Sequence, residues 1–500
     1  MINPAVPGFN PDPSVVRVDD AYYLVTSSFD YLPGLPIYRS TDLVDWEIIG
    51  HVAPRPEQLQ LDGTITNSGV YAPTIRYRDG VFYVIVTVVR SPVGCVLFTA
   101  TDPVGPWSDG VTLDIQGIDP DLVWDDDGEA YVTFSGQPLD GTEHPPILQA
   151  RVDLKTGRRL EEPRSLWPKT DRRFPEAPHL YRRGDYWYLV VAEGGTERGH
   201  GVSVARSASL TGPFEPHPDN PVLTAAGTSR KVQNTGHGDL VEAPDGTSAL
   251  ILLGVRPLGV MYGYSPLGRE TFVTRVDWVD DWPIPAPVEL TLRMGTESLR
   301  LDLTGGAALD EAWIAVGALP SDLSRPSSAG LVLDSGDAGM GSRRPAFVGQ
   351  RQRHHRTVVS TQVDASGGQG GLAIRYDELH WITLEARGSS SGAVTVVATA
   401  SLSGVQQRWE VDLPASGTRL RMETEPVTGY APELLGGERI RLIAESDGTD
   451  VLVADLDGRY WSAETAASFT GRVVGLCATQ GSVTFTDFHY LGTDQPELKP

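Results

Sequence analysis

The chain has 500 residues, a hydrophobic content of 40% and a formal net charge of −24 at pH 7. Its length exceeds the usual limit for one hydrophobic core, so we expect two domains. The negative charge argues against a nucleic-acid partner, because nucleic-acid binding depends on Lys and Arg that neutralise phosphates, and it favours a neutral substrate. No segment approaches the ~20 apolar residues that a membrane span requires.

The first 300 or so residues repeat one pattern five times: a turn rich in Asp and Gly, then a strand of β-branched and aromatic residues. The copies are RVDDAYYLVTSS (17–28), RYRDGVFYVIVTVV (76–89), VWDDDGEAYVTFS (123–135), YRRGDYWYLVVAEG (181–194) and VEAPDGTSALILLG (241–254). Their spacing of roughly 50–60 residues fits blades of about four strands. The pattern therefore predicts a five-bladed β-propeller, whose radial closure hides most strand edges. A single large sandwich, the alternative, does not explain the fivefold return.

The texture of the sequence changes after the proline cluster near residues 283–287. Gly- and Ser-rich turns now separate short alternating strands such as HRTVVSTQVDA, AVTVVATASLSG and SVTFTDFHYLG. Such strands predict an antiparallel β-sandwich of the jelly-roll, concanavalin-like kind. We therefore expect an all-β chain with a propeller over residues 1–296 and a sandwich accessory domain over residues 297–500.

Each aromatic strand is preceded, at a near-constant distance, by a segment flanked by Pro or Gly. These segments are FNPDPS, VYAPT, GIDPDL, PEAPHL and TGHGDL, and they should place Asp12, Tyr71, Asp119, Glu176 and His237 at one end of a central cavity. Three carboxylates that converge there are costly to keep ionised, so we expect at least one raised pKa. Glycoside hydrolysis requires a protonated carboxylic acid together with a carboxylate. The alternative, that each acid only caps a turn, explains one such residue better than three in register.

Seven motifs in this order resemble glycoside hydrolase family 43, in particular its β-xylosidase/α-L-arabinofuranosidase branch with a C-terminal sandwich. They are NPAVPGFNPDPS, SSFDYLPGLPIY, YAPTIRYRDGVFYV, GIDPDLVWDDDG, FPEAPHLYRRGDYWYLVVAEGGT, QNTGHGDLVEAPDG and LGRETF; AGLVL, GLAIRYDELHW and FTGRVVGLCA extend the resemblance into the second domain. The resemblance implies that Asp12 is the general base, that Glu176 is the general acid, and that Asp119 orients the acid and holds its pKa up. It also implies inversion, with base and acid ~6.5–9.5 Å apart.

Four further residues match substrate-binding positions of the family. Phe29 and Tyr71 should wall the terminal-sugar subsite, although both could simply pack in a blade. Arg269 should lie beside the base and the sugar hydroxyls, the alternative being a surface ion pair. His237 should lie near the sugar, where relatives hold a calcium ion or a water cluster; otherwise it is a core histidine. The mechanism requires no cofactor, so any calcium would be structural.

Three positions depart from the family pattern. Asp121 stands where relatives usually carry a small residue, which adds a charge near Asp119 or marks a solvated turn. Arg198 stands where an aromatic residue is expected, and Tyr71 stands where many relatives have Trp. These departures affect the expected specificity and leave the reaction class unchanged.

The sequence as a whole predicts an exo-acting, inverting hydrolase that releases terminal β-D-xylose, α-L-arabinofuranose or both from xylo-oligosaccharides or arabinoxylan fragments. One alternative is an arabinofuranosidase for arabinoxylan side chains with little xylosidase activity. Another, of a different class, is a non-catalytic sugar-binding propeller. We expect a small neutral oligosaccharide as the partner and a cytoplasmic location, since the N-terminus does not read as a signal peptide. A homo-oligomer is left open.

Overall fold

The structure, a computed structural model, describes residues 2–136, 145–167, 170–259, 263–336, 339–388, 393–414, 418–427, 437–446 and 448–495. Its contacts divide the chain into two units. The propeller unit comprises Met1–Arg256 and Glu270–Thr291, and the sandwich unit comprises Pro257–Arg269 and Leu292–Pro500. This division falls a few residues before the boundary predicted at 296/297. It also groups the segment Pro257–Arg269, which the sequence places inside the propeller, with the sandwich.

The propeller unit consists of five antiparallel blades, as the fivefold repeat predicts. Each blade has four strands, and the fourth blade has one more, short strand (β18). The first blade has β1 (Ser14–Val18), β2 (Ala21–Val25), β4 (Gly34–Ser40) and β5 (Glu47–Ala53), and the second has β6 (Gly69–Arg78), β7 (Val81–Val89), β8 (Gly94–Ala100) and β9 (Val111–Thr112). The third has β10 (Gly117–Trp124), β11 (Ala130–Gly136), β12 (Ile147–Arg151) and β13 (Arg164–Ser165), and the fourth has β14 (Glu176–Arg183), β15 (Tyr186–Glu193), β16 (Gly201–Ser207), β17 (Glu215–Pro216) and β18 (Leu223–Thr224). The fifth has β19 (Gln233–Glu242), β20 (Ser248–Val255), β21 (Glu270–Val279) and β22 (Trp282–Pro285). The short strand β3 (Tyr31–Leu32) lies in the loop between β2 and β4.

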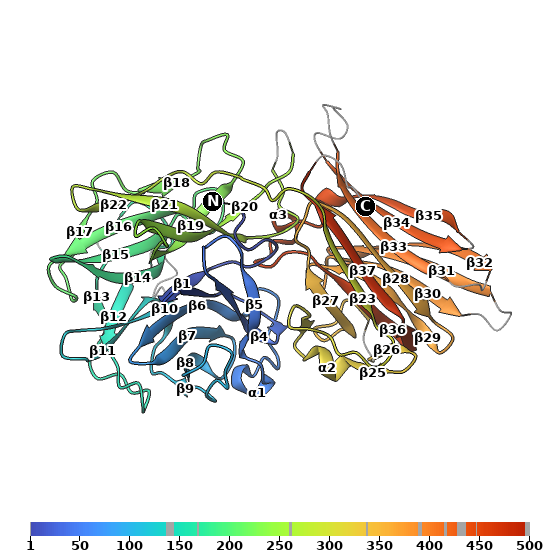
Figure 1. The fold of residues 1–500 in the computed structure, drawn as a ribbon, viewed down its shortest axis with the longest axis horizontal. Coiled ribbons are helices and arrows are strands. Elements are labelled where there is room, and N and C mark those ends of the chain that lie inside the picture. The colour runs from blue at the N-terminus through green and yellow to red at the C-terminus, as the bar shows by residue number, and fades with distance from the viewer. Residues whose placement is uncertain are drawn as a thin grey trace. The chain divides into compact units, whose positions relative to one another are not determined.

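The first strands of the five blades form a closed ring. β1, β6, β10, β14 and β19 each contact the next, and β19 contacts β1. Figure 1 shows these strands in the middle of the unit, with the later strands of each blade farther out. The aromatic run of each repeat is the second strand of its blade, so the predicted cavity residues belong to the first strand and its start. Because every blade has the same strand order, these starts lie at one end of the ring.

The N-terminal residues form hydrogen bonds with the last blade and so connect it to the first. The Asn3 backbone N–H donates to the Thr291 carbonyl at 2.9 Å, and its side-chain amide donates to the Val273 carbonyl at 2.8 Å. Ala5 and Val6 pair with Thr271 on β21. The apolar part of this contact is a buried cluster that includes Val6, Leu24, Ile251 and Val273. This closure removes the strand edges that an open array of blades would expose.

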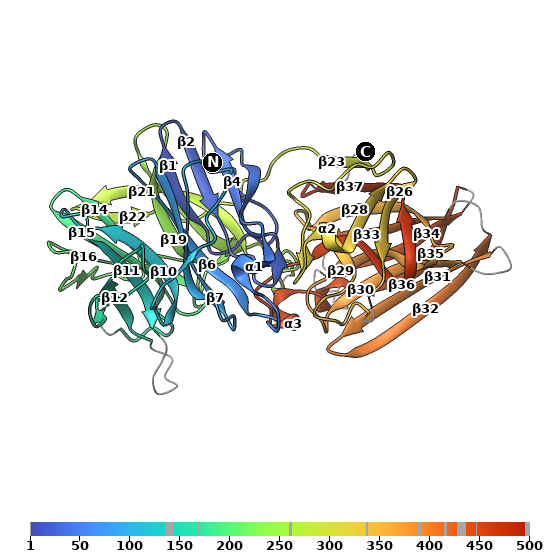
Figure 2. The same ribbon diagram turned by 90° about the horizontal axis from the view of Figure 1, so that it is seen from below.

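The sandwich unit is a β-sandwich whose two layers share one long strand. Its strands, most of which Figure 2 labels, are β23 (Glu297–Asp302), β24 (Ala315–Val316), β25 (Ser324–Ser327), β26 (Gly330–Asp334), β27 (Phe347–Arg351), β28 (Arg356–Asp364), β29 (Gly368–Arg375), β30 (Trp381–Gly388), β31 (Ala393–Leu402), β32 (Val405–Pro414), β33 (Arg419–Pro426), β34 (Glu438–Ser446), β35 (Thr449–Asp457), β36 (Val473–Phe485) and β37 (Asp487–Thr493). The first part of β36 pairs with β27 and β29, and its last residues pair with β26 and β28.

The two layers enclose one hydrophobic core. One layer has the order β27-β36-β29-β30-β31-β32, and the other has the order β23-β37-β28-β33-β34-β35. Leu384 on β30 and Ala398 on β31 belong to the same buried cluster as Leu420 on β33 and Leu442 on β34. The sandwich predicted from the alternating strands is confirmed.

Helices are few and short in the part of the chain that the structure describes. They are α1 (Pro56–Leu59), α2 (Pro320–Leu323), α3 (Ala463–Ala466) and the 3-10 turn η1 (Gly458–Tyr460). None of them has the length or apolar character to cross a bilayer.

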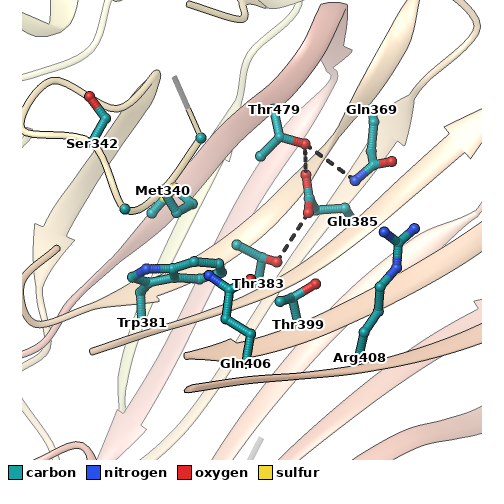
Figure 3. A pocket seen from close by; sticks show the side chains of 12 residues that line it. Met340, Ser342, Gln369, Trp381, Thr383, Glu385, Thr399, Gln406, Arg408 and Thr479 are labelled. Carbon is teal, nitrogen blue, oxygen red and sulfur yellow. Dashed lines mark hydrogen bonds between the residues drawn. The ribbon is translucent and has the colours of Figure 1, made fainter. Parts of the chain in front are cut away.

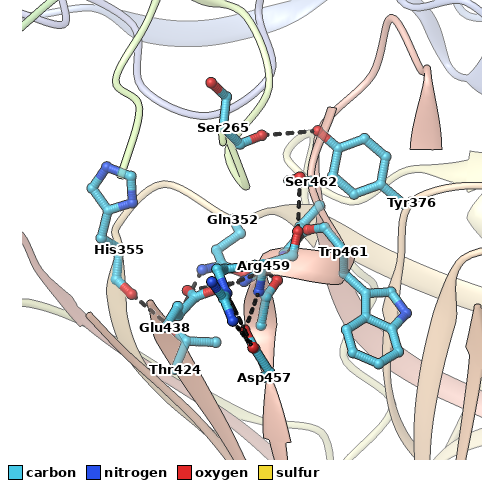
Figure 4. A network of polar contacts seen from close by, with 12 residues as sticks. Ser265, Gln352, His355, Tyr376, Thr424, Glu438, Asp457, Arg459, Trp461 and Ser462 are labelled. Carbon is cyan, nitrogen blue, oxygen red and sulfur yellow. Dashed lines mark hydrogen bonds and ion pairs between the residues drawn. The ribbon is translucent and has the colours of Figure 1, made fainter. Parts of the chain in front are cut away.

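A buried ion pair fixes the end of the sandwich core. Arg472 and Glu438 both have fully buried side chains, and two hydrogen bonds of 3.0 and 2.6 Å join them. Arg472 also donates to the carbonyls of Trp461 and Gly458, so all three nitrogens of its guanidinium group make hydrogen bonds. Figure 4 shows Glu438 beside the more exposed pair of Arg459 and Asp457.

The same network includes Ser265 and Pro266, which belong to the sandwich unit. Ser265 donates to Glu464 through its backbone N–H at 2.6 Å and through its hydroxyl at 2.9 Å. Its carbonyl accepts from the Tyr376 hydroxyl at 3.2 Å (Figure 4). The Arg472 backbone N–H donates to the Pro266 carbonyl at 3.3 Å. Ser265 and Pro266 are therefore fixed by other residues of the sandwich unit.

We predict that Arg472→Met destabilises the protein by roughly 3–5 kcal/mol, because it leaves the Glu438 carboxylate buried without its cation. Arg459→Met is the matched control. It removes a partly exposed pair with Asp457 and should cost at most about 1 kcal/mol. Thermal unfolding of both variants beside the wild type measures the difference. Equal shifts in Tm for the two variants would contradict the structural role of the buried pair.

Candidate active site

The starts of the first strands share a local irregularity. The ladder between the first and second strand of a blade shifts register at one place in each of blades two to four and at two places in blade five, and the shifts nearest the predicted residues are Val70/Pro73, Ile118/Asp121, Glu176/His179 and Gly236/Gly238. In the first blade Asp12 lies just before β1. Asp12, Asp119 and His237 have φ values of 57°, 53° and 52°. Such left-handed backbone is strained for residues other than glycine and is concentrated at functional sites.

The bulges refine the predicted register of the three carboxylates. Asp119 occupies the first position of the bulge in β10, and Ala177 occupies the same position in β14, with a φ of 51°. Glu176 therefore lies one residue earlier than Asp119 on its strand. The Ala177 N–H donates to Asp119 Oδ2 at 3.1 Å. Asp119 thus holds the backbone directly beside Glu176, and its role in orienting the acid stays a prediction.

Asp12 is nearly buried and fixed from two sides. The Ser27 hydroxyl donates to its Oδ2 at 2.6 Å, and His237 Nδ1 lies 3.5 Å from its Oδ1. Asp12 as a whole is 5% exposed to solvent. Ser27 follows the first aromatic strand and was not among the predicted residues, although it belongs to the motif SSFDYLPGLPIY. The structure therefore brings Asp12 and His237 together and adds a hydroxyl that orients the carboxylate.

Glu176 is the more accessible acid, with 22% of its side chain exposed. Its Oε1 lies 3.9 Å from Nε2 of His200, a fully buried histidine. The Asn234 carbonyl lies 3.0 Å from His200 Nδ1, and a carbonyl only accepts, so Nδ1 carries the proton. In the neutral ring Nε2 is therefore an acceptor that faces Glu176. His200 was not predicted, although the motif GGTERGH contains it.

A glycine provides the space for this histidine. A Cβ added to Gly236 would meet three atoms of the His200 ring at 2.5 Å. No other residue fits there without displacing the ring, so the TGHGDL motif supports both His237 and, through Gly236, the placement of His200. Arg198, in the same loop as His200, is exposed.

Phe29 and Tyr71, the predicted aromatic wall of the sugar subsite, lie against each other. The rings of Phe29 and Tyr71 contact each other edge to face, with centroids 5.8 Å apart. Phe29 is buried, whereas Tyr71 is half-buried and donates its hydroxyl to the Asn67 carbonyl at 2.6 Å. Phe29 also pairs by its backbone with Val70, the residue next to Tyr71. The two aromatics therefore form one surface that joins the first and second blades.

Arg269 belongs to the sandwich unit. It is 8% exposed, donates to the Phe469 carbonyl at 3.2 Å and stacks on the Phe469 ring at 5.2 Å. The alternative of a surface ion pair does not describe this buried arginine. Its predicted place beside Asp12 and the sugar stays a prediction.

One layer deeper, a polar network ties all five blades together. Its members, which we call the axial network, are Ser14, Arg76, Asp121, His179, Tyr181 and Asp239. The Arg76 guanidinium lies 2.5 Å from Asp121 Oδ1, 3.1 Å from Asp239 Oδ2 and 3.1 Å from His179 Nδ1. Ser14 donates to Asp239 at 2.6 Å, and the Tyr181 hydroxyl also hydrogen-bonds to Asp239.

The axial network corrects one sequence interpretation. Asp121 is fully buried, paired with Arg76, and accepts the Leu180 N–H at 2.9 Å, so it is not part of a solvated turn. Burial would raise the pKa of Asp239, but the Arg76 guanidinium, aided by His179, lowers that pKa to about 2. The ring of His179 in turn faces that of His237 at 6.4 Å. The network therefore supports the histidine that contacts Asp12.

The residues of the candidate site do not indicate a metal-binding site. The described residues contain no group of three His, Cys, Asp or Glu side chains placed to hold one. Calcium takes six to eight oxygen ligands, whereas His237 presents an imidazole and faces a second imidazole, which is a poor fit. The calcium that the resemblance allows stays a prediction, and so does the raised pKa among the three carboxylates.

Comparison with known proteins identifies the family. The model of glycosyl hydrolases family 43 matches residues 1–283, and that of the β-xylosidase C-terminal concanavalin A-like domain matches residues 307–492. The chain belongs to glycosyl hydrolases family 43. It is therefore a glycoside hydrolase, as the motifs predict.

Relatives match over nearly the whole chain. A non-reducing end α-L-arabinofuranosidase of Bacteroides ovatus is 33% identical over 98% of this chain and 93% of its own length. A xylosidase/arabinosidase of Butyrivibrio fibrisolvens is 32% identical, with 99% of each chain covered. The crystal structure of a xylan β-1,4-xylosidase from Bacillus halodurans superposes with a TM-score of 0.87 at 28% identity, covering 98% of this chain and 99% of the other.

We predict that Asp239→Asn lowers the stability of the propeller by about 2 kcal/mol near neutral pH, since the pKa difference from the ordinary value of 3.8 corresponds to that amount. The folded-state pKa is depressed, so this contribution is complete above about pH 4 and disappears as the pH falls toward 2. Denaturation of the variant and the wild type from pH 7 to pH 2 should show a gap that closes in that window. Asp277→Asn, an exposed change on β21, is the control. A gap that stays constant with pH would contradict the pairing.

We predict that His200→Asn lowers kcat about tenfold for substrates with poor leaving groups, because the side chain that faces Glu176 is lost. The loss should be smaller for a dinitrophenyl glycoside, whose leaving group needs little protonation. A merely structural role would reduce both rates equally. The ratio of kcat values for the two substrates is the measurement.

Proposed function

We propose that the protein is an exo-acting, inverting pentosidase that releases terminal β-D-xylose and α-L-arabinofuranose from short xylo-oligosaccharides or arabinoxylan fragments. The observation that carries the proposal is that Asp12, Asp119 and Glu176 lie at the starts of three first strands, where Asp12 accepts from Ser27, Asp119 accepts the Ala177 N–H and Glu176 faces His200 at 3.9 Å. The names of the relatives, which include both sugars, support the choice of substrates.

The proposed mechanism is a single displacement. Asp12 takes a proton from a water molecule, which attacks the anomeric carbon from the face opposite the leaving group. Glu176 donates its proton to the glycosidic oxygen as the bond to the anomeric carbon breaks. Ser27 and His237 hold the base in place, while Asp119 holds the backbone beside the acid. Carboxyl groups and water suffice, so the reaction needs no cofactor.

The hydrogen-bond partners of the two acids differ in the direction that their roles require. The Ser27 hydroxyl donates to Asp12, and this hydrogen bond favours the ionised carboxylate, in opposition to its burial. Glu176 is more exposed, and in the neutral ring the nitrogen of His200 that faces it is an acceptor, which favours a protonated partner. This asymmetry supports Asp12 as base and Glu176 as acid.

A second candidate is an arabinofuranosidase with little xylosidase activity. The Bacteroides ovatus relative, whose name is that of an arabinofuranosidase, favours it, since that protein matches 98% of this chain. Both candidates use the same carboxylates. They differ in the sugar that Phe29, Tyr71 and Arg269 accept. The homo-oligomeric state and the cytoplasmic location stay predictions.

The test is hydrolysis of the p-nitrophenyl glycosides of β-D-xylopyranose and α-L-arabinofuranose by the wild type, Asp12→Ala and Glu176→Ala. We expect turnover of at least one glycoside and a loss of roughly 10²–10⁴-fold or more in kcat for Asp12→Ala, because the attacking water loses its base. Glu176→Ala should lose less on these activated substrates than on xylobiose. Proton NMR of the first sugar released should show the inverted anomer.

Several outcomes would contradict the proposal. Activity that survives Asp12→Ala would mean that another group is the base, and a retained anomer would exclude the single displacement. Turnover of the arabinofuranoside alone would favour the second candidate. A wild type that binds sugars without hydrolysing them would point to the non-catalytic alternative.

A further inference from the structure

The sandwich unit contains a hollow of about 560 Å³ that the proposed reaction does not use. Side chains from five neighbouring strands and from the loop before β27 surround it. Figure 3 shows its labelled residues, which are Met340, Ser342, Gln369, Trp381, Thr383, Glu385, Thr399, Gln406, Arg408 and Thr479. It lies within the layer β36-β29-β30-β31-β32, on the face opposite the hydrophobic core.

Strand alternation explains why the hollow is polar. On β30, Ile382 and Leu384 belong to the core, so Thr383 and Glu385 must point to the other face. The register places Thr383 opposite Thr399, and Thr399 opposite Arg408, across β30, β31 and β32. These three side chains therefore form one row, and Trp381 and Gln406 extend the wall on the next positions. The side chains of this face therefore take no part in the hydrophobic core of the sandwich.

Glu385 is the unusual member of this face. It is 3% exposed, accepts hydrogen bonds from Thr383 at 3.1 Å and from Thr479, and is not in an ion pair among the described residues. The Gln369 amide donates to Thr479 at 3.3 Å and completes this series of hydrogen bonds (Figure 3). Burial raises the pKa of Glu385, although these hydrogen bonds oppose the rise. A buried carboxyl is costly, and such groups in a hollow mark binding sites.

The walls offer what an uncharged sugar needs. Trp381 and Met340 supply an apolar side, while Gln406 and Arg408 supply hydrogen-bond donors and Thr399 a hydroxyl. Arg408 already pairs with Glu410 at 2.5 Å, so the rim offers no excess positive charge to a phosphate or a carboxylate. The described residues form no group of three side chains that would hold a metal ion. A ring with one apolar face and several hydroxyls matches this mixture.

We propose that this hollow is a second carbohydrate site, which binds a neutral pentose-containing oligosaccharide and holds it on the sandwich unit. The inference rests on the substrate class proposed above. The sugar's hydroxyls accept from Gln406 and Arg408 and donate toward Glu385, while its apolar face lies against Trp381. Such a site raises the concentration of substrate near the enzyme without taking part in bond cleavage.

The test is native electrophoresis of the full chain through gels that contain soluble arabinoxylan, compared with gels that lack it. We expect the wild type to be retarded, and the variant Gln406→Ala/Arg408→Ala to lose at least fivefold in apparent affinity. Gln407→Ala/Arg439→Ala is the matched control. It removes the same two residue types, also exposed on the sandwich, and Arg439 likewise pairs with an acid, Asp455. The control should migrate like the wild type.

Hydrolysis of the p-nitrophenyl glycosides separates this inference from the proposed function, because that reaction depends on Asp12 and Glu176 and uses none of the residues that line the hollow. We expect the same kcat/KM for the wild type and both double variants. Equal retardation of both double variants, or no retardation of an active wild type, would overturn the second site and leave the function standing. A selective loss of retardation in an enzyme that hydrolyses neither glycoside would support the site and refute the function.

Discussion

The propeller depends on one largely buried arginine. Arg76, on the second blade, bridges Asp121 of the third and Asp239 of the fifth, and it contacts His179 of the fourth; Ser14 of the first blade also binds Asp239. Removing either carboxylate would leave a buried cation partly unpaired, which is far more costly than losing an exposed pair. Because its members come from all five blades, the network fixes the relative positions of the five first strands. The candidate site lies directly on this ring.

The carboxylates occupy different positions relative to the bulges. β10 and β14 carry the same register shift, but Glu176 lies one residue before the bulge position that Asp119 occupies on its own strand. Asp119 can then accept the Ala177 N–H and support the acid instead of competing with it. On the other side of the ring His237, at its own bulge, contacts Asp12. A repeated scaffold thereby gives three carboxylates three separate surroundings.

The sequence predicted the features that repeat or alternate. Five aromatic strands gave the blades, and alternating strands gave the sandwich. Residues next to turn prolines, such as Asp12 and Glu176, could be placed at one end because their spacing recurs. His200 and Ser27 could not be found this way, since each acts through a contact between segments far apart in the fold or on a neighbouring strand. Asp121 was ambiguous for a related reason: its partner Arg76 lies 45 positions away, and only the closed ring brings the two together.

Buried carboxyl groups in this protein fall into two kinds, and the difference indicates what each can do. Asp239 and Glu438 are held by guanidinium groups, which neutralise their charge. They can stabilise the fold, but their charge is not available to a ligand. Glu385 is held by threonine hydroxyls, which satisfy its hydrogen bonds without supplying a charge. A carboxyl of this second kind can still change its protonation or exchange a hydroxyl partner, because no cation fixes it. A hollow that contains such a group is therefore suited to the hydroxyls of a sugar, whereas the axial network and the Arg472 pair are suited only to support.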